Sequence, residues 1–501
     1  MNLRDLRARS QQLEREKGGI GERYFSCVEA NVIGPDGIGL QLKVKNDAGE
    51  FDEEGSNEIE QLWKDFGRRG EFEVTGEHSS QNFDRLSVRA SARDGDVLQL
   101  IYRGTQNKSR ISFQLLEGQY LDDYHNILLP TGNEVRMGVE LNTFKRKVAY
   151  WILSKHPGDS QYGYAYDGRR LRIPAYGVEP GAPVQAIHIS RTKRPEETRS
   201  VPWITPAMDP INMLAGYEEA ELVAARAQAC KHVFFERSQF APDGTPLDYA
   251  TEDTGGRLVE DIEPGGATEL PIGQHANFYN PTHPSQSFPE FTKDFRRKIA
   301  AALNCSYNTL FTDLEGVNYS SIRAGLLDER EQWKMTQLWY ISASKQIQFE
   351  AWLEMQLLVG AFRNFNMSDF DRIRRATNWK PRRWSWVDPL KDIEASSAAI
   401  EAKLTTRTRV IAEQSNEDFE ETIDELSEES QYISDAGLDP MLHEPRRSGQ
   451  FIDTAEQPNV PGENISDLEE PSPSDLSARR SEQARAQARH PATGQFVPNG
   501  S

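Results

Sequence analysis

The sequence predicts a protein of the α+β class with more than one folding unit, and three observations support this prediction. The chain has 501 residues, which is more than one hydrophobic core usually holds. Alternating apolar and polar residues recur between about 38 and 190, as they do in β-strands. After residue 207 the apolar spacing becomes that of helices and includes a proline-free run of about forty residues.

The predicted mixed domain lies at about 20–200, with helices first and a sheet after them. Residues 1–33 have helical spacing, and Leu40, Leu42 and Val44 begin the alternation of strands. The same alternation recurs in FDRLSVRA (83–90), DVLQLIYRG (96–104), RISFQLLEG (110–118), VRMGVELNTF (135–144), KVAYWILSK (147–155) and QAIHIS (185–190).

A helix is predicted from 207 to 237, because Asp209 followed by Pro210 suits a helix cap and the first helical position. The glycine- and proline-rich stretch 238–285 is too long for a turn, so we expect it to be a small module. A second helix is predicted at 286–303.

The longest predicted helix runs from 322 to about 362, after a glycine-containing acidic loop. Ser320 or Ser321 can cap its first turn, and it would measure about 60 Å. Its apolar residues cover more than one stripe, so its own domain or neighbouring copies should bury it on several sides.

The C-terminal part begins with a tryptophan-rich extended piece at 378–392, and helical spacing follows from 393 to about 429. Between Arg409 and Arg446 there are twelve acidic residues and no Lys or Arg, so the net charge of −20 is mostly local. From 445 onward the composition predicts disorder until a partner binds. A basic surface of the kind that binds nucleic acid is not evident from the sequence.

Composition fits a soluble protein that is not secreted. Mean hydropathy is −0.69, and the most apolar run, 352–362, is too short for a membrane helix and contains Glu354. The first 17 residues are charged and lack the apolar core of a secretion signal. Cys27, Cys230 and Cys305 are far apart, which predicts reduced thiols rather than disulfides or a zinc site.

No catalytic constellation is evident, and we expect no enzyme activity and no cofactor. The phosphate-binding loop G-x-x-x-x-G-K-[ST] and the motifs G-x-S-x-G and H-E-x-x-H are absent. His188 is interpreted as a packed or edge-strand residue rather than a ligand. Two acidic clusters could hold Mg²⁺ but are interpreted as solvated surface: Asp122 with Asp123, and Glu218 with Glu219 and Glu221. Three tryptophans could stack on bases but are interpreted as packing residues: Trp379, Trp384 and Trp386.

The order of several segments resembles the portal proteins of tailed bacteriophages, in their lambda-type family. The segments are IHISRTKRPEETRSVPWITPAMDP (187–210), TDLEGVNYSSIRAGLLDERE (312–331) and WSWVDPLKD (384–392), within a resemblance that covers about 3–440. Asn304 stands where the family often has glycine.

The resemblance implies a portal-type ring subunit, with no chemistry of its own, in a homo-oligomer of about twelve copies. Its parts would be a mixed α/β wing, a helical stem, a small clip, a tunnel loop, a long wing helix and a helical crown. The expected boundaries are wing 1–206, stem helix 207–237, clip 238–285, stem helix 286–303, tunnel-loop region 304–320, long wing helix and return strand 321–387, crown 388–444 and tail 445–501.

The resemblance also implies partners and sites. The ring would occupy one capsid vertex of the virion, after assembly in the cytoplasm of the host bacterium, with the major capsid and scaffolding proteins as neighbours. Double-stranded DNA would pass through the channel, and the terminase large subunit and later the head-tail connector would bind the clip; no membrane is implied. The implied channel residues are Asp313, Glu315, Gly316, Asn318, Tyr319, Ser320, Glu218 and Glu219, and the implied clip residues are Asp261, Glu263 and Asn280.

Acidic or neutral residues in the channel would let DNA slide, because a basic lining would hold the phosphates. Gly316 would give the loop the backbone freedom to move while DNA passes. Two other interpretations stay open: a carboxylate–metal enzyme that processes DNA, and an acidic cytosolic scaffold that binds through its tail. Metal-dependent cleavage of plasmid DNA would favour the first, and loss of assembly on deletion of 445–501 would favour the second.

Overall fold

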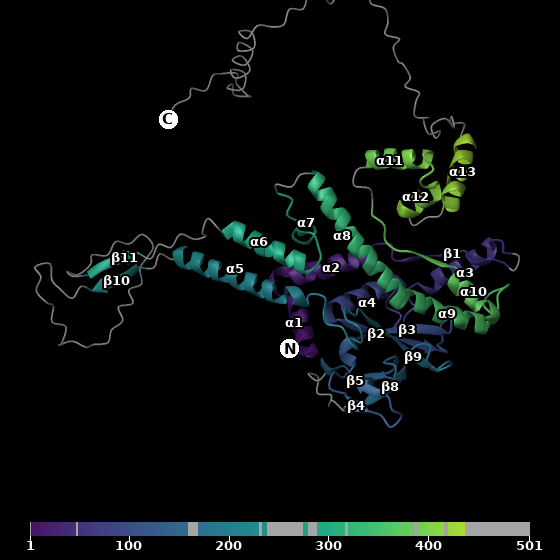
Figure 1. Cartoon of the computed structure of the whole chain (residues 1–501), viewed down its shortest axis with the longest axis horizontal. Coiled ribbons are helices and arrows are strands. Elements are labelled where there is room, and N and C mark those ends of the chain that lie inside the picture. The colour runs from purple at the N-terminus through teal and green to yellow at the C-terminus, as the bar shows by residue number, and fades with distance from the viewer. Residues whose placement is uncertain are drawn as a thin grey trace, which may run out of the picture. The chain divides into compact units, whose positions relative to one another are not determined.

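The structure is a computed structural model that describes residues 2–46, 49–158, 169–229, 233–237, 274–278, 288–315, 319–384, 389–414 and 419–435 (Figure 1). The chain divides into two compact units, residues 1–423 and 424–501. Helices and strands are mixed, as the predicted α+β class requires. None of the helices in these ranges combines the length and the apolar character that a membrane span needs.

Two helices open the first unit, as predicted, with a sharp break between them. Asn2 caps the first helix by accepting a hydrogen bond from the backbone N–H of Asp5. Gly18 and Gly19 have φ of 71° and 74°, which glycine adopts without strain, and there the chain changes direction. The elements are α1 (Leu3–Arg15), the 3₁₀ turn η1 (Lys17–Gly19) and α2 (Ile20–Val32).

The strand predicted at 83–90 is wrong, because this segment belongs to helix α4 (Ser80–Asp94). Ser79 caps the helix, and the buried side chains of Phe83, Ser87 and Ser91 recur every four residues on its inner face. The apparent alternation came from Leu86, which is exposed, and from small residues around it. Helix α3 (Glu53–Phe66) was not predicted.

The strands form two antiparallel sheets and two short ribbons. The order is β3-β2-β9 in the three-stranded sheet and β4-β5-β6-β7-β8 in the five-stranded sheet, and β1 pairs with β12 as a separate ribbon. Strands were predicted at β1, β2, β3, β5, β6, β7 and β9, whereas β4 and β8 were not. The bounds are β1 (Gly39–Leu42), β2 (Asp96–Arg103), β3 (Ile111–Glu117), β4 (Ile127–Leu128), β5 (Glu134–Arg136), β6 (Val139–Leu141), β7 (Lys147–Leu153), β8 (Arg170–Pro174), β9 (Val184–Ser190) and β12 (Thr377–Lys380), with the 3₁₀ turn η2 (Gly118–Tyr120) after β3.

Two hydrophobic cores hold these elements together. In the larger core, the Trp352 ring lies 5.2 Å from the Trp63 ring and 6.1 Å from the Phe66 ring, which joins α3 to the long helix. The smaller core lies between the two sheets and includes Leu98 and Tyr150. Cys27 and Cys305 are buried free thiols, as predicted, and Cys230 lies outside the described ranges.

The two helices predicted at 207–237 and 286–303 are confirmed in part. A 3₁₀ turn, η4 (Thr205–Ala207), runs directly into α5 (Met208–Ala229), so the predicted cap at Asp209 is wrong and Asp209 lies inside the first turn. The helix does not extend to 237, because β10 (Val233–Arg237) pairs with β11 (Gln274–Phe278). The second predicted helix, α6 (Phe288–Ala302), is confirmed and lies beside α5, where Tyr217 stacks on Phe288 (Figure 1).

The predicted long helix is confirmed and contains an unpredicted π-helical segment. It consists of α8 (Tyr319–Tyr340), the π-helix η5 (Ile341–Lys345) and α9 (Gln346–Val359). Because the helix begins at Tyr319, the predicted cap by Ser320 or Ser321 is wrong. The short helix α7 (Tyr307–Phe311) precedes it.

A buried polar cluster surrounds the π-helix. Lys345 forms an ion pair with Asp84 of α4 at 2.7 Å, and both side chains are almost completely buried. The Tyr340 hydroxyl donates to the other Asp84 oxygen at 2.8 Å, and the Ser344 hydroxyl donates to the Gln99 amide oxygen at 3.0 Å. The long helix is thereby joined to α4 and β2 through hydrogen bonds as well as apolar packing.

The remaining helices are shorter than predicted. The helical spacing at 393–429 corresponds to three helices, α11 (Pro389–Glu401), α12 (Arg407–Gln414) and α13 (Phe419–Asp435), and η6 (Met367–Asp369) with α10 (Phe370–Arg375) precedes them. Trp379 packs on Trp63, and the Trp384 indole donates to Asn31, so packing is confirmed for these two tryptophans. Trp386 and the tail 445–501 lie outside the described ranges.

Candidate functional site

The implied tunnel-loop region is built on a short helix that its own residues cap. The Ser306 hydroxyl accepts from the backbone N–H of Thr309 at 3.2 Å and starts α7. Thr312, with φ of 54°, ends it. Asn304, at the position where the related family often has glycine, has φ of 53°, a left-handed conformation that asparagine tolerates better than most residues.

Glu329 fixes this short helix to the long one. Its buried carboxylate accepts hydrogen bonds from the Thr309 hydroxyl at 2.8 Å, from the Ser306 backbone at 3.3 Å and from the Trp333 indole at 3.1 Å. A buried carboxylate that accepts three hydrogen bonds holds the three donor groups in a fixed orientation. The base of the loop therefore has one defined position relative to α8.

Asp313 is engaged within the protomer. It accepts from the Tyr307 hydroxyl at 2.6 Å and from the backbone N–H of Glu315 at 3.0 Å, and Lys293 of α6 lies 3.7 Å away. These hydrogen bonds, together with the Lys293 charge, lower the pKa of Asp313 below its usual value. Glu315 is exposed, and its carboxylate makes no ion pair with another residue in the described part of the chain. Asp313 thus shapes the loop, and Glu315 presents its charge to solvent.

Glu218 of α5 faces basic residues of α6, a charge pairing that was not predicted. Glu218 pairs with Arg296 of α6 at 3.0 Å, while Glu219 is exposed. Arg296 also lies over the Phe311 ring and Arg297 over the Tyr307 ring. The sequence FRRK at 295–298 shows this charge, but the prediction considered only the acidic residues of the loop and α5. Glu218 of α5 and Arg296 of α6 therefore partly neutralise each other.

The other implied site residues lie at the start of α8 or outside the described ranges. Tyr319 and Ser320 begin α8. Gly316 and Asn318 lie outside the described ranges, as do the clip residues Asp261, Glu263 and Asn280.

A second charged cluster, not predicted from the sequence, lies at the beginning of β2. Asp96 is fully buried and accepts from Arg7 of α1 at 2.6 Å and from Arg199 at 2.7 Å. Burial alone would raise the pKa of Asp96, but the positive charges of Arg199 and Arg7 hold it well below the usual value. Asp123 accepts from the same two arginines. The cluster joins residues about a hundred positions apart.

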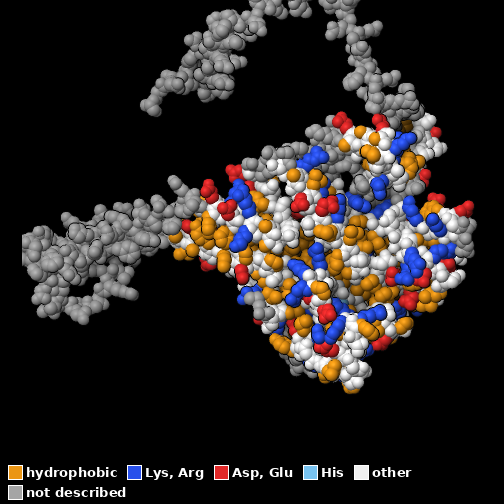
Figure 2. Space-filling model, in the orientation of Figure 1, with side chains coloured by type: hydrophobic (Ala, Val, Ile, Leu, Met, Phe, Trp, Pro, Cys, Tyr) orange, Lys and Arg blue, Asp and Glu red, His pale blue; other side chains and the backbone are white. Residues whose placement is uncertain are grey.

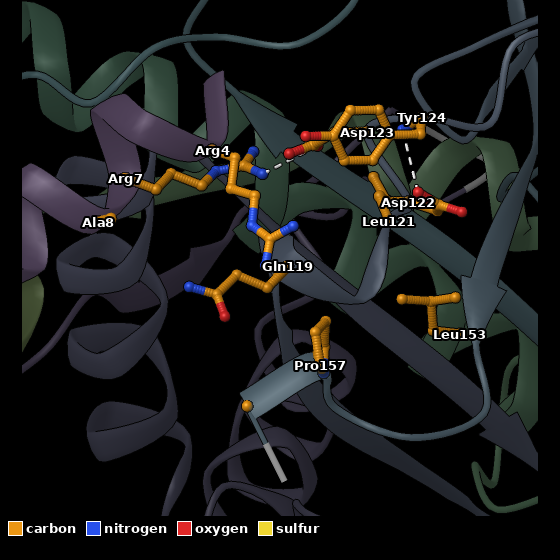
Figure 3. Close-up of a pocket in the computed structure, with 11 residues that line it drawn as sticks. Arg4, Arg7, Ala8, Gln119, Leu121, Asp122, Asp123, Tyr124, Leu153 and Pro157 are labelled. Atoms are coloured by element: carbon orange, nitrogen blue, oxygen red, sulfur yellow. Dashed lines mark hydrogen bonds and ion pairs between the residues drawn. The ribbon is translucent and has the colours of Figure 1, made fainter. Parts of the chain in front are cut away.

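A cavity of about 570 Å³ opens beside this cluster, between α1 and the segment after η2 (Figure 3). Arg4, Arg7, Asp122 and Asp123 line it, and Arg7 donates to Asp123 at 3.2 Å. Asp122 is held by Arg170 at 2.5 Å. The interpretation of Asp122 and Asp123 as solvated is therefore wrong, because both take part in ion pairs. In the described ranges, no group of three or more His, Cys, Asp and Glu side chains is arranged to hold a metal ion.

His188 is a packed histidine on the edge strand β9, as interpreted from the sequence. Its ring is almost fully buried, with Nδ1 3.0 Å from Lys147 Nζ and Nε2 3.0 Å from Asp96. A charged lysine only donates hydrogen bonds, so Nδ1 accepts and Nε2–H donates to Asp96. Burial, with the Lys147 charge, lowers the pKa of His188 to about 4.

This histidine predicts a pH dependence of stability. Between pH 6.5 and 4 the unfolded chain binds a proton at His188 that the folded chain does not, so stability falls as pH falls through this window. We expect a loss of about 2–4 kcal/mol in the free energy of unfolding. Urea unfolding at several pH values, for the wild type and His188→Gln, measures it. Parallel pH profiles of the two proteins would contradict the assignment.

A family model and curated relatives match this chain to phage portal proteins. A family model described as "Phage portal protein, lambda family" matches residues 1–337. The "Probable portal protein" of Halomonas phage phiHAP-1 is 33% identical over 434 residues, which cover 86% of this chain and 80% of that protein. "Portal protein B" of Escherichia phage lambda is 22% identical over 413 residues, which cover 77% and 75%. A solved chain in the virion of a native gene transfer agent particle is 13% identical with a TM-score of 0.42, over 81% of this chain and 93% of that one.

Proposed function

The chain belongs to the lambda family of phage portal proteins, and we propose that its copies close into a ring around a channel for double-stranded DNA. Portal function is structural, so this protein acts through assembly. We further propose that the ring has about twelve copies and occupies one capsid vertex of the virion, after assembly in the host cytoplasm.

The observation that carries the ring proposal is the apolar surface of α5. Ile211 and Leu214 are buried against the protomer, whereas Met213, Leu222 and Val223 of the same helix are exposed. Large apolar side chains exposed together on one helix mark a contact surface. Figure 2 shows hydrophobic side chains exposed over the α5–α6 pair, with Lys and Arg beside them. A neighbouring copy would cover this surface.

Electron microscopy of the full-length protein, viewed down the symmetry axis, tests the ring. We expect closed rings of about twelve subunits with a central channel wide enough for duplex DNA. Val223→Asp should reduce the fraction of closed rings, because it places a charge in the interface. A protomer that stays monomeric at high concentration and with scaffolding protein present would overturn the proposal.

For the channel, we propose that the loop at 312–320 and the stem helices face DNA without holding it. Lys293 and Arg296 are paired with Asp313 and Glu218, which reduces their attraction for phosphates. Gly316, Asn318, Tyr319 and Ser320 would continue the same surface. A substitution of Glu315 tests this proposal better than one of Asp313, because replacing Asp313 would also remove hydrogen bonds that shape the loop.

Glu315→Lys should slow packaging or increase the DNA retained on the ring, because it turns each loop charge from repulsive to attractive. The rate of DNA packaging into capsids and the salt dependence of duplex binding measure the effect. Glu77→Lys, an equal charge change at an exposed position before α4, is the control and should leave both unchanged. Wild-type packaging by Glu315→Lys rings would refute the low-affinity channel.

We infer the remaining partners from the place that each segment has in the order of segments of the portal family. We propose that the terminase large subunit, and later the head-tail connector, bind 238–285 through Asp261, Glu263 and Asn280. The helical part at 388–444 would face the capsid interior, near the major capsid and scaffolding proteins. The alternative of a carboxylate–metal enzyme gains no support from Asp122 and Asp123, whose oxygens are held by arginines.

A further inference from the structure

Helix α13 presents an exposed face that combines acidic and apolar side chains. Leu426 and Tyr432 are 47% and 79% exposed, and Glu425 and Glu429 are exposed beside them. Residues three, four or seven positions apart lie on the same side of a helix, so these four residues share one face, which we call the α13 face. Among the described residues, neither glutamate has an ion-pair partner. The α13 face is therefore open to another surface.

The charge of the helix indicates what kind of surface covers this face. No Lys or Arg occurs between Arg409 and Arg446, so the face lies in the most acidic part of the chain. A second copy of α13 is unsuitable, because pairing two such helices would bring like charges together. The phosphates of DNA are unsuitable for the same reason. The partner should carry positive charge and enough aliphatic surface to cover Leu426 and Tyr432.

The same chain contains a segment with this chemistry. Only four Lys or Arg residues follow Arg447, and they are grouped within eleven positions: Arg479, Arg480, Arg485 and Arg489. We call 477–490, SARRSEQARAQARH, the arginine segment; it has one glutamate and lies outside the described ranges. Arginine pairs with carboxylates and stacks on aromatic rings, so it suits both kinds of side chain on the α13 face. The arginine segment and this face belong to the same unit, 424–501.

The chain between the two is long enough for them to meet. Residues 436–476 connect the end of α13 to the arginine segment. A random chain of that length has an average end-to-end distance of about 35 Å, whereas the α13 face is about 10 Å long. A segment tethered in this way has an effective concentration in the millimolar range. Weak, exposed ion pairs are sufficient to hold it at that concentration.

We propose that the arginine segment binds the α13 face of its own copy, with arginine side chains on Glu425 and Glu429 and across the Tyr432 ring. This contact lies within one copy and does not require the ring. In a ring, the bound arginines would reduce the repulsion between the acidic segments of neighbouring copies, and only this consequence rests on the proposed function.

Photo-crosslinking of the full-length protein tests the contact. A p-benzoylphenylalanine in place of Tyr432 keeps an aromatic side chain in the α13 face and reacts with C–H groups that touch it. Mass spectrometry then identifies the segment that is attached. We expect most crosslinks to attach to 477–490, in a species with the mass of one copy, at protein concentrations below as well as above those at which copies associate.

Two double substitutions should each lower the yield of this crosslink about three-fold or more. Glu425→Lys with Glu429→Lys reverses the charge of the α13 face. Arg480→Gln with Arg485→Gln removes charge from the arginine segment and leaves α13 unaltered, so a fault in the helix cannot explain its effect. Added salt should also lower the yield, because it screens exposed charges.

The matched control is Asp424→Lys with Asp435→Lys, which makes the same change of charge at two exposed positions on the opposite side of α13. The yield should stay unchanged in this control. Equal yields with and without the two test substitutions would refute the contact, and so would crosslinks that avoid 477–490. Crosslinks that only join two copies would assign the face to another copy's segment and overturn the contact within one copy. Ring formation is tested separately, by electron microscopy.

Discussion

Asp96→Asn is expected to lower the free energy of unfolding of the protomer by about 3–5 kcal/mol. Asp96 is the shared acceptor for Arg7, Arg199 and His188, and all four side chains are almost completely buried. The asparagine keeps the size of the side chain but removes the charge that balances two guanidinium groups. Urea unfolding of the dissociated protomer, followed by circular dichroism, measures the difference.

The matched control is Asp294→Asn, the same chemical change in an exposed pair. Asp294 lies 3.2 Å from Arg297 on α6, and both side chains are more than half exposed. Exposed pairs contribute about 0–1 kcal/mol, so this variant should unfold almost as the wild type does. If Asp96→Asn and Asp294→Asn had equally small effects, the buried cluster would not stabilise the fold as we describe.

Lys345→Met should cost about 3–5 kcal/mol, because it leaves the buried Asp84 carboxylate without its cation. Methionine fills a similar volume, so the loss reports mainly the charge. The double variant Lys345→Met with Asp84→Asn should recover most of the stability, since asparagine is neutral and can still accept from the Tyr340 hydroxyl.

A double-mutant cycle on Lys345 and Asp84, measured by urea unfolding, separates the pair from its surroundings. We expect the double variant to lose much less stability than the sum of the two single losses. Additive effects would mean that Lys345 acts through its contact with the Trp63 ring, 5.4 Å away, instead of through Asp84.

Elements with strong local patterns could be predicted from the sequence. The strand-like pattern of DVLQLIYRG (96–104) predicted β2, and the apolar spacing after residue 320 predicted the long helix. The pattern of FDRLSVRA was misinterpreted because its serine, Ser87, packs inward while Leu86 is exposed, the reverse of what their polarity suggests. Tertiary packing determined the helical conformation of this segment, and its local sequence pattern did not indicate a helix.

The polar clusters could not be predicted because their members are distant in sequence. Arg7, Asp96 and Arg199 meet only after α1 packs beside β2, and each looks like an ordinary surface charge when the chain is read in order. Asp313 was implied as a channel residue by its family position. Its bonds to Tyr307 and Lys293 depend on how α6, α7 and the loop pack.

The π-helical segment also accommodates one extra residue within the long helix. A π-turn holds about one residue more than an α-turn, and one residue corresponds to about 100° of rotation around the helix axis. Phe349 and Trp352 point into the core although this extra residue lies between them and Tyr340. Removing one residue from Ile341–Lys345 would restore regular α-helical turns and leave both aromatic rings in nearly the same direction, whereas removing one residue between Gln346 and Gln348 would turn them by that angle, away from the core. The long helix should therefore tolerate the loss of one residue in the π segment better than the same loss at the start of α9.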